Sequence, residues 1–89
     1  MLQRIFVPKQ VEAQLQELPV DTRVHVEAYL DNLDHLMGTL SAERLVMRFT
    51  RGPAGFLGRV EGACVFFALD TVLRKALIQR IAAEPPAPR

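Results

Sequence analysis

Cys64, His25 and His35 are the thiol and imidazole side chains of this sequence, and such groups can provide nucleophilic or metal-binding chemistry. A thiol and an imidazole act together in catalysis only when they lie within hydrogen-bond reach. Cys64 falls in an apolar run that predicts a strand, whereas both histidines fall in a predicted helix. Their ten-residue spacing does not fit a one-turn metal pair, and one cysteine excludes an internal disulfide or a Cys-pair zinc motif. We expect no metal or cofactor, and Cys64 remains only a weak catalytic candidate beside its simpler interpretation as a packed strand residue.

Arg48, Arg59 and Arg80 form the main candidate binding set. Each falls in a different predicted strand, so the three guanidinium groups could converge on one face of a sheet. Such a group of arginines binds phosphate or carboxylate through paired hydrogen bonds. An alternative stays open at this point: the three could be independent surface charges, some of them paired with Glu61 or Asp70.

The charges of the chain are divided unevenly between its two halves. Residues 1–43 carry three basic and seven acidic side chains, a net charge of −4, whereas residues 44–89 carry eight basic and three acidic ones, a net charge of +5. A basic half of this kind suggests a polyanion or an acidic protein as the partner. The same division of charge would arise if Arg and Lys were placed on solvated strand edges, where they prevent aggregation.

The elements that must position these residues begin with a short strand and two helices. Residues 2–7 alternate in the manner of a strand. Apolar residues at helical spacing predict one helix at residues 9–18, ended by Pro19, and a second that starts near residue 22 and ends at Gly38. The short connection between the two argues for an antiparallel helical hairpin.

Strands are predicted in the second half, after a connector at residues 39–43. Residues 45–50 alternate in strand fashion. Residues 56–70 are rich in aromatic and branched side chains, which favours two short strands around Gly62. Residues 75–82 are the last strand candidate. Because short loops join these strands, we expect them to be antiparallel neighbours.

These elements predict an α+β fold: an N-terminal strand, an antiparallel helical hairpin, and then three to four antiparallel strands that form one sheet. We expect a single domain over residues 1–83 and a disordered Pro-rich tail at residues 84–89. No apolar run approaches the roughly 18 residues of a membrane span, and the first residues lack a signal-peptide core. We therefore expect a cytoplasmic protein without a membrane partner. The predicted core contains Leu15, Leu30, Leu33, Val65 and Phe67.

This order of elements, together with one motif, resembles the RelE/ParE superfamily of bacterial toxins from toxin–antitoxin modules along nearly the whole chain. Members often show a G-x-L/W-R-x-R-V-G-x-Y-R-V-x-Y pattern, and this sequence has GFLGRVEGACVFF from Gly55. Gly55, Arg59, Val60 and Val65 match, and Phe67 stands where an aromatic is usual. The later ALIQRIA is similar to the family's last strand. The resemblance implies the fold described above and an antitoxin protein as partner.

The sequence departs from the family pattern at the residues that carry the chemistry. The Tyr–Arg pair of the pattern falls on Ala63 and Cys64, and the basic group that often follows the last strand falls on Ala83, Glu84 and Pro85. In ribonuclease members, the arginine would clamp the scissile phosphate while basic or tyrosine groups move protons. Alanine and cysteine cannot supply these donors, so we predict no ribosome-dependent cleavage of messenger RNA.

Three functions are compatible with this resemblance and its departures. The first is a toxin or degenerate toxin-like protein that acts by binding an antitoxin or a macromolecular target. The second is a ribosome-dependent endoribonuclease with a non-standard active site, which would contact nucleic acid or the ribosome. The third is a non-toxin module that self-associates, for example as a homodimer. We expect the first, with Arg48, Arg59 and Arg80 in binding and no enzyme activity.

Overall fold

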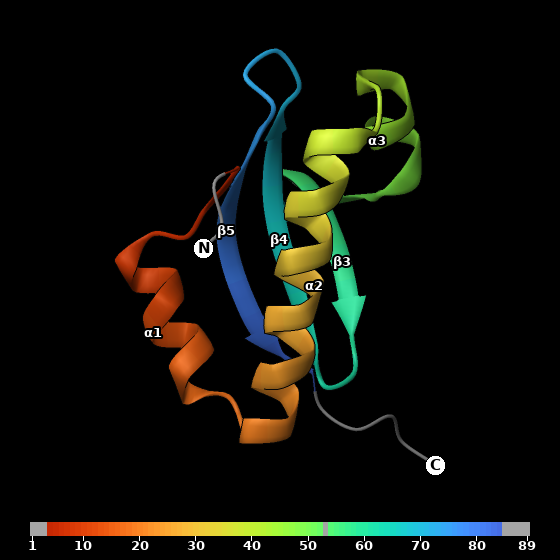
Figure 1. Cartoon of the computed structure of the whole chain (residues 1–89). Helices are drawn as coiled ribbons and strands as arrows, with labels where there is room; N and C mark the ends of the chain where they lie inside the picture. Colours follow the sequence, from red (N-terminus) through yellow and green to blue (C-terminus); the bar gives the residue numbers. More distant parts are fainter. Residues whose placement is uncertain (1–3, 53, 85–89) are drawn as a thin grey trace.

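The three helices lie within residues 9–48, after a short first strand. The strands that follow them join that first strand in one sheet behind the helices (Figure 1). The computed structural model describes residues 4–52 and 54–84 of the 89. The elements in chain order are β1 (Ile5–Phe6), α1 (Lys9–Glu17), α2 (Val20–Thr39), α3 (Ala42–Arg48), β2 (Thr50–Gly52), β3 (Gly55–Val60), β4 (Ala63–Asp70) and β5 (Lys75–Ala83).

The sheet has the strand order β1-β5-β4-β3-β2. β1 is parallel to β5, and the other neighbouring strands are antiparallel. β3 turns back into β4 through Gly62, whose φ of +87° suits glycine. The register between β4 and β5 shifts at Phe66 and Phe67, where a bulge interrupts the ladder. The predicted pair of strands around Gly62 and the predicted last strand are therefore confirmed.

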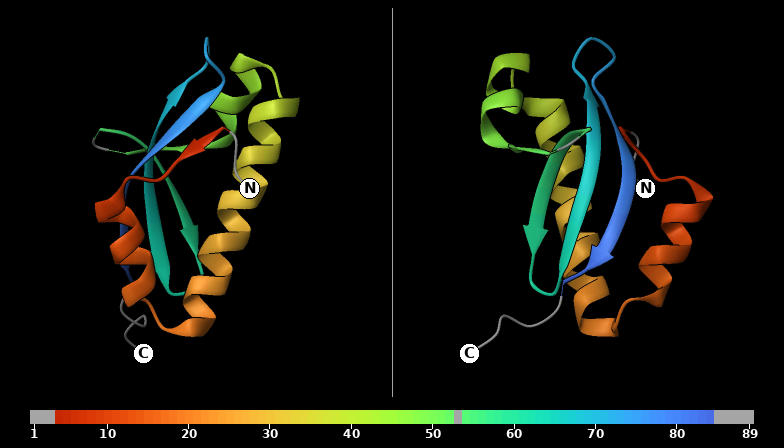
Figure 2. Two further views of the ribbon diagram at one scale, coloured as in Figure 1. Left: turned by 60° about the vertical axis from the view of Figure 1, so that its left-hand side comes forward. Right: turned by 180° about the vertical axis from the view of Figure 1, so that it is seen from behind.

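The two faces of the sheet have different surroundings. α2 lies across one face, in front of β4 in Figure 1, while α1 packs against β5 at the side of the sheet. In the rear view of Figure 2 the strands lie in front, with no helix over them. We call this side the uncovered face. Because side chains alternate along a strand, it carries Leu57 and Arg59 of β3, Cys64 and Phe66 of β4, and Arg80 of β5.

The core lies between the helices and the covered face. All five residues predicted for it, Leu15, Leu30, Leu33, Val65 and Phe67, are buried together there. Phe67 is fully buried, and the ring of Phe49 meets it edge-on with centroids 5.2 Å apart. Edge-to-face packing of this kind adds to the stabilisation that burial alone gives an aromatic pair.

The strand predicted at residues 45–50 is wrong, and so is the connector before it. Residues 42–48 form α3 instead, and only residues 50–52 form a strand. Ser41 begins the helix because its Oγ accepts the Arg44 backbone N–H at 3.3 Å. Leu45 is buried but Met47 is 85% exposed, so the alternation of apolar residues does not reflect a half-buried strand.

The end of α2 also differs from the sequence prediction. Gly38 lies inside the helix rather than beyond it, and the Arg4 side chain occupies the space that a Cβ on Gly38 would fill. Arg74, in the β4–β5 turn, reaches the helix end: its Nε donates to the Met37 carbonyl at 2.8 Å, and its Nη2 donates to the Leu40 carbonyl. A cation at a helix C-terminus satisfies free carbonyls and complements the helix dipole.

Parts of two predicted segments lie outside the described residues: residues 2–3 of the first strand and residues 85–89 of the tail.

Candidate functional site

The structure does not place the three candidate arginines on one face of the sheet. Arg59 and Arg80 share the uncovered face, on opposite sides of β4. Arg48 is the last residue of α3 and not a strand residue. It lies on the helix side of β3, so the predicted placement on three strands holds for Arg59 and Arg80 only. Arg59 and Arg80 share Cys64 as a neighbour. Their positive charges lower the pKa of its thiol, and burial has the larger, opposite effect.

The uncovered face combines an aromatic ring with positive charge. The Arg80 guanidinium lies over the Phe66 ring, 5.1 Å from its centroid, in a cation–π arrangement. Arg59 contacts Glu84 at 3.8 Å, and the Arg59 side chain is 74% exposed. A pair at this distance and exposure contributes little to stability, so Arg59 is available to an anionic partner. Arg80 is exposed as well.

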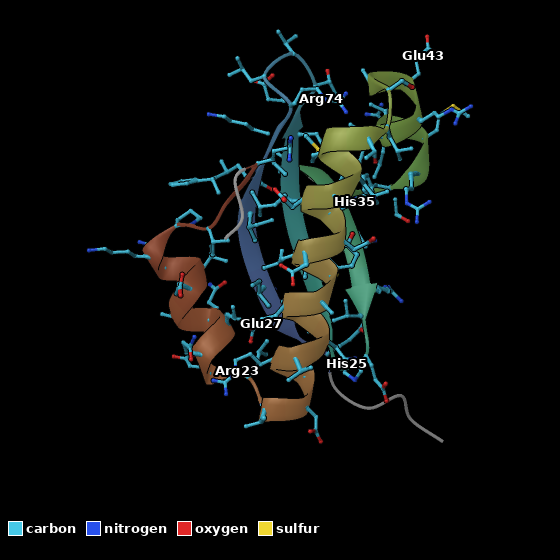
Figure 3. All side chains as sticks on the ribbon, viewed as in Figure 1. Arg23, His25, Glu27, His35, Glu43 and Arg74 are labelled. Carbon is cyan, nitrogen blue, oxygen red and sulfur yellow. The ribbon has the colours of Figure 1, made fainter. Side chains whose placement is uncertain are left out.

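Cys64 does not have the surroundings of a catalytic nucleophile. Burial, followed by the charge of Glu84, raises the pKa of its thiol, so the neutral thiol dominates at pH 7. Cys64 faces the uncovered side, whereas His25 and His35 lie on α2 over the other face (Figure 3). His25 instead pairs with Glu61 at 3.6 Å. The structure thus assembles no Cys–His pair from these residues.

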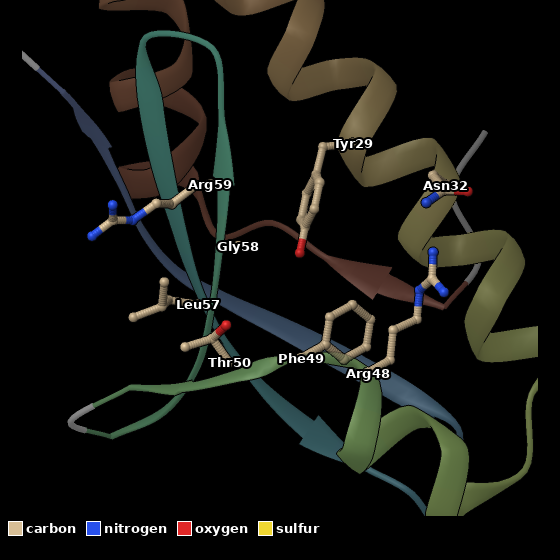
Figure 4. Close-up of a pocket in the computed structure, with 8 residues that line it drawn as sticks. All are labelled: Tyr29, Asn32, Arg48, Phe49, Thr50, Leu57, Gly58 and Arg59. Atoms are coloured by element: carbon tan, nitrogen blue, oxygen red, sulfur yellow. The ribbon is translucent and has the colours of Figure 1, made fainter. Parts of the chain in front are cut away.

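A second site lies beside the outer edge of β3. A groove of about 570 Å³ opens between α2, the end of α3 and strands β2 and β3. Figure 4 shows the Tyr29 hydroxyl pointing toward Gly58 and the Arg48 guanidinium lying close to Asn32. We call this the β3-edge groove; it is lined by Tyr29, Asn32, Arg48, Phe49, Thr50, Leu57, Gly58 and Arg59.

Tyr29 and Gly58 fit together at the base of this groove. A Cβ on Gly58 would lie 1.9 Å from the Tyr29 hydroxyl, so only glycine leaves room for the ring. Burial raises the pKa of Tyr29 to about 12; the nearby Cys64 adds to this and Arg48 opposes it. The hydroxyl is therefore a neutral hydrogen-bond donor at ordinary pH.

Sequence reasoning did not identify this groove. Neither Tyr29 nor Gly58 is among the predicted site residues, and Gly58 is a strand residue that admits the Tyr29 ring. A glycine inside a strand was the available signal, because it often marks a close approach by another group. Which group approaches depends on how α2 crosses the sheet, and local sequence does not encode that.

A third surface feature is apolar. Phe6, Leu73 and Leu77 are each more than 40% exposed and line a pocket of about 510 Å³ near the β4–β5 turn. Exposed apolar groups that cluster in this way are typical of contact surfaces.

Two further findings concern the part of the chain that the structure describes. No group of three or more His, Cys, Asp or Glu side chains there could hold a metal ion. None of its helices combines the length and apolarity needed to cross a membrane.

The architecture is an α+β fold with three helices on and around a five-stranded sheet. A chain of the archaeal RelE–RelB complex from Pyrococcus horikoshii OT3 matches it with a TM-score of 0.67, over 98% of this chain and 100% of that chain, at 18% sequence identity. No family model and no curated protein matches the sequence. The chain has a RelE-like fold, which confirms the fold predicted from the sequence. At this identity the likeness is one of fold.

Proposed function

We propose that this chain is the toxin-like half of a toxin–antitoxin pair and acts by binding a protein antitoxin or another macromolecular target. The observation that supports this most is the whole-length likeness to a chain crystallised as a RelE–RelB complex. The basic second half of the chain, with Arg59 and Arg80 on the uncovered face, suits an acidic partner.

Binding rather than RNA cleavage fits the residues of the uncovered face. Arg59 and Arg80 could hold a phosphate, but cleavage also needs groups that move protons to and from the reacting oxygens. The positions at the centre of the resemblance carry Ala63 and Cys64, and the Cys64 thiol stays neutral at pH 7 because its pKa is raised. A ribosome-dependent endoribonuclease with a non-standard active site is the alternative.

Expression in bacteria, with and without the neighbouring gene, tests the proposal. We expect the neighbouring gene to encode a short acidic protein that co-purifies with this chain and relieves any growth defect. Absence of a co-purifying partner and of a growth defect would contradict the toxin–antitoxin assignment.

A ribosome-programmed cleavage assay separates the binding and ribonuclease alternatives. We expect purified protein to leave messenger RNA intact on ribosomes. Cleavage that disappears in a Cys64→Ser variant would contradict this expectation and make Cys64 a catalytic residue.

Self-association is a second candidate function, favoured by the exposed apolar cluster of Phe6, Leu73 and Leu77. Sedimentation equilibrium of the parent and of Leu73→Ser tests it. A dimer in the parent that dissociates in the variant is expected if this cluster is the contact surface.

A further inference from the structure

The two edges of the sheet differ in how far their backbone groups are paired. At one edge β1 pairs with β5 through Ile5 and Phe6, and beyond β1 the helix α1 lies against β5. There the Gln14 side chain accepts the Ile81 backbone N–H at 2.9 Å, which satisfies a group that would otherwise be free. This side of β5 is therefore paired at residues 76–77 and again at Ile81.

The opposite edge is occupied only in part. β2 pairs with residues 55–57 of β3 and stops there. Residues 58–60 continue the strand and pair with β4 on one side. Among the described residues, no strand and no side-chain hydrogen bond was found on their outer side. Backbone groups on such an edge can pair with another extended chain.

The β3-edge groove surrounds this free stretch. Its lining includes side chains from both sides of β3: Figure 4 shows Tyr29, Phe49 and Arg48 on the helix side, and Leu57, Thr50 and Arg59 on the other. The groove therefore passes around the strand edge itself. A chain added to that edge would direct alternate side chains to these two sides.

The lining of the groove favours negative charge. Arg48 lies on one side and Arg59 on the other. Arg59 has an exposed contact with Glu84, but the described residues that line the groove include no acidic one. The neutral Tyr29 hydroxyl and the Asn32 amide add hydrogen-bond donors beside Arg48. Carboxylates on a bound chain would form charge-assisted hydrogen bonds with these groups.

We propose that the β3-edge groove binds an extended acidic segment of the partner protein, which continues the sheet beside residues 58–60 in line with β2. Carboxylates on opposite sides of this segment meet Arg48 and Arg59, so the acidic residues lie an odd number of positions apart. Backbone pairing supplies the affinity and the two arginines supply the charge preference, as in other cases of strand addition. This inference rests on the proposed function, because it specifies where that partner binds.

The probe is a blocked eight-residue peptide of alternating Thr and Val with two Glu residues placed three positions apart. Hydrogen exchange followed by NMR reports strand pairing directly. We expect slower exchange at the Arg59 amide when the peptide binds. The strand pairing directs the amides of residues 58 and 60 toward β4, so Arg59 carries the outward amide that gains a partner. A peptide with the same sequence but N-methylated backbone amides should give no protection, and one with Lys in place of Glu should bind more weakly.

Charge variants locate the contact. Arg48→Gln and Arg59→Gln should each weaken peptide binding by about 1.5- to 5-fold, the range for exposed ion pairs. Lys9→Gln is the matched control, since Lys9 is an exposed cation at the start of α1, beside the occupied edge. The control should bind the peptide like the parent. Equal binding by all three variants, or equal binding of the Glu and Lys peptides, would overturn the proposal.

The co-purified complex distinguishes this inference from the proposed function. If a partner binds and the Arg59 amide exchanges as in the free chain, the groove is not its site, although the toxin–antitoxin proposal stands. If no partner co-purifies but the peptide protects the Arg59 amide, the groove binds acidic strands and the toxin–antitoxin proposal fails.

Discussion

Tyr29 is the only tyrosine of the chain, and the chain has no tryptophan. Absorbance at the tyrosinate band therefore follows one side chain. We expect its ionisation midpoint near pH 12 rather than the ordinary 10.0, because burial against Gly58 disfavours the charged form. A midpoint close to 10 in the folded protein would show that Tyr29 is not held at the base of the β3-edge groove.

The same shift makes the stability of the fold depend on pH. Between pH 10 and about 12 the unfolded chain has lost the Tyr29 proton while the folded chain keeps it. The unfolded state then binds fewer protons, so the free energy of unfolding falls as pH rises through this window and is unaffected by Tyr29 below it. Denaturant titrations of the parent and of Tyr29→Phe should show a steeper alkaline decline in the parent. Parallel curves would contradict the prediction.

A substitution of one residue, Phe67, tests the arrangement of the core. Phe67 is fully buried and contacts the rings of Phe49 and Phe56. Phe67→Ala should lower the free energy of unfolding by about 3–5 kcal/mol, because it removes the ring and leaves a cavity. Phe6→Ala is the control: Phe6 is 61% exposed, so a change within about 0.5 kcal/mol is expected. Urea titration measures both.

At the scale of elements, the strand predicted at residues 45–50 shows where the sequence misleads. Leu45, Met47 and Phe49 alternate, but Leu45 and Phe49 are also four residues apart, which is helical spacing. A short window cannot separate the two periods when apolar residues fall on both. The start signal was present in Ser41, which caps α3, with Glu43 in its first turn. The long helix and the late strands were predictable because their patterns extend over more residues.

Arg74 joins two elements that are far apart in sequence. It sits in the β4–β5 turn at a φ of +59° and donates to two carbonyls at the end of α2. Arg74→Gln should lower the free energy of unfolding by about 1–2 kcal/mol, since the charge-assisted hydrogen bonds to the helix end are lost. Arg44→Gln is a matched control on exposed α3, where little change is expected. Urea titration of both variants measures the difference, and equal stabilities would show that the helix end does not depend on Arg74.

At the scale of the whole molecule, the charge division predicts how the complex responds to salt. Attraction between exposed charges is screened over about 10 Å at 0.1 M salt. We expect the dissociation constant of the native partner to rise between low and moderate salt. The rise should be smaller for Arg48→Ala, Arg59→Ala and Arg80→Ala than for the parent. A flat response in every protein would place the interface on apolar surface instead.

The candidate site was only partly predictable at this scale. The three arginines were identifiable because guanidinium groups in the basic half were the obvious anion ligands. How the three arginines are grouped could not be predicted. The grouping depends on the register that pairs Arg59 with Cys64 and Phe66 with Arg80. It also depends on α3, which places Arg48 in a helix instead of a strand. Register and helix placement are set by contacts between distant segments.

The unequal edges of the sheet also set how this chain can polymerise. Growth of a fibril by strand addition requires each subunit to offer two accessible edges, one for the preceding copy and one for the next. Here β1 and α1 occupy the β5 side, and the free backbone lies beside residues 58–60 of β3. Two copies that paired through this stretch would use the same surface on both molecules, and the assembly would close as a two-fold dimer. Pairing through this stretch should therefore end at two copies and should not by itself extend into filaments.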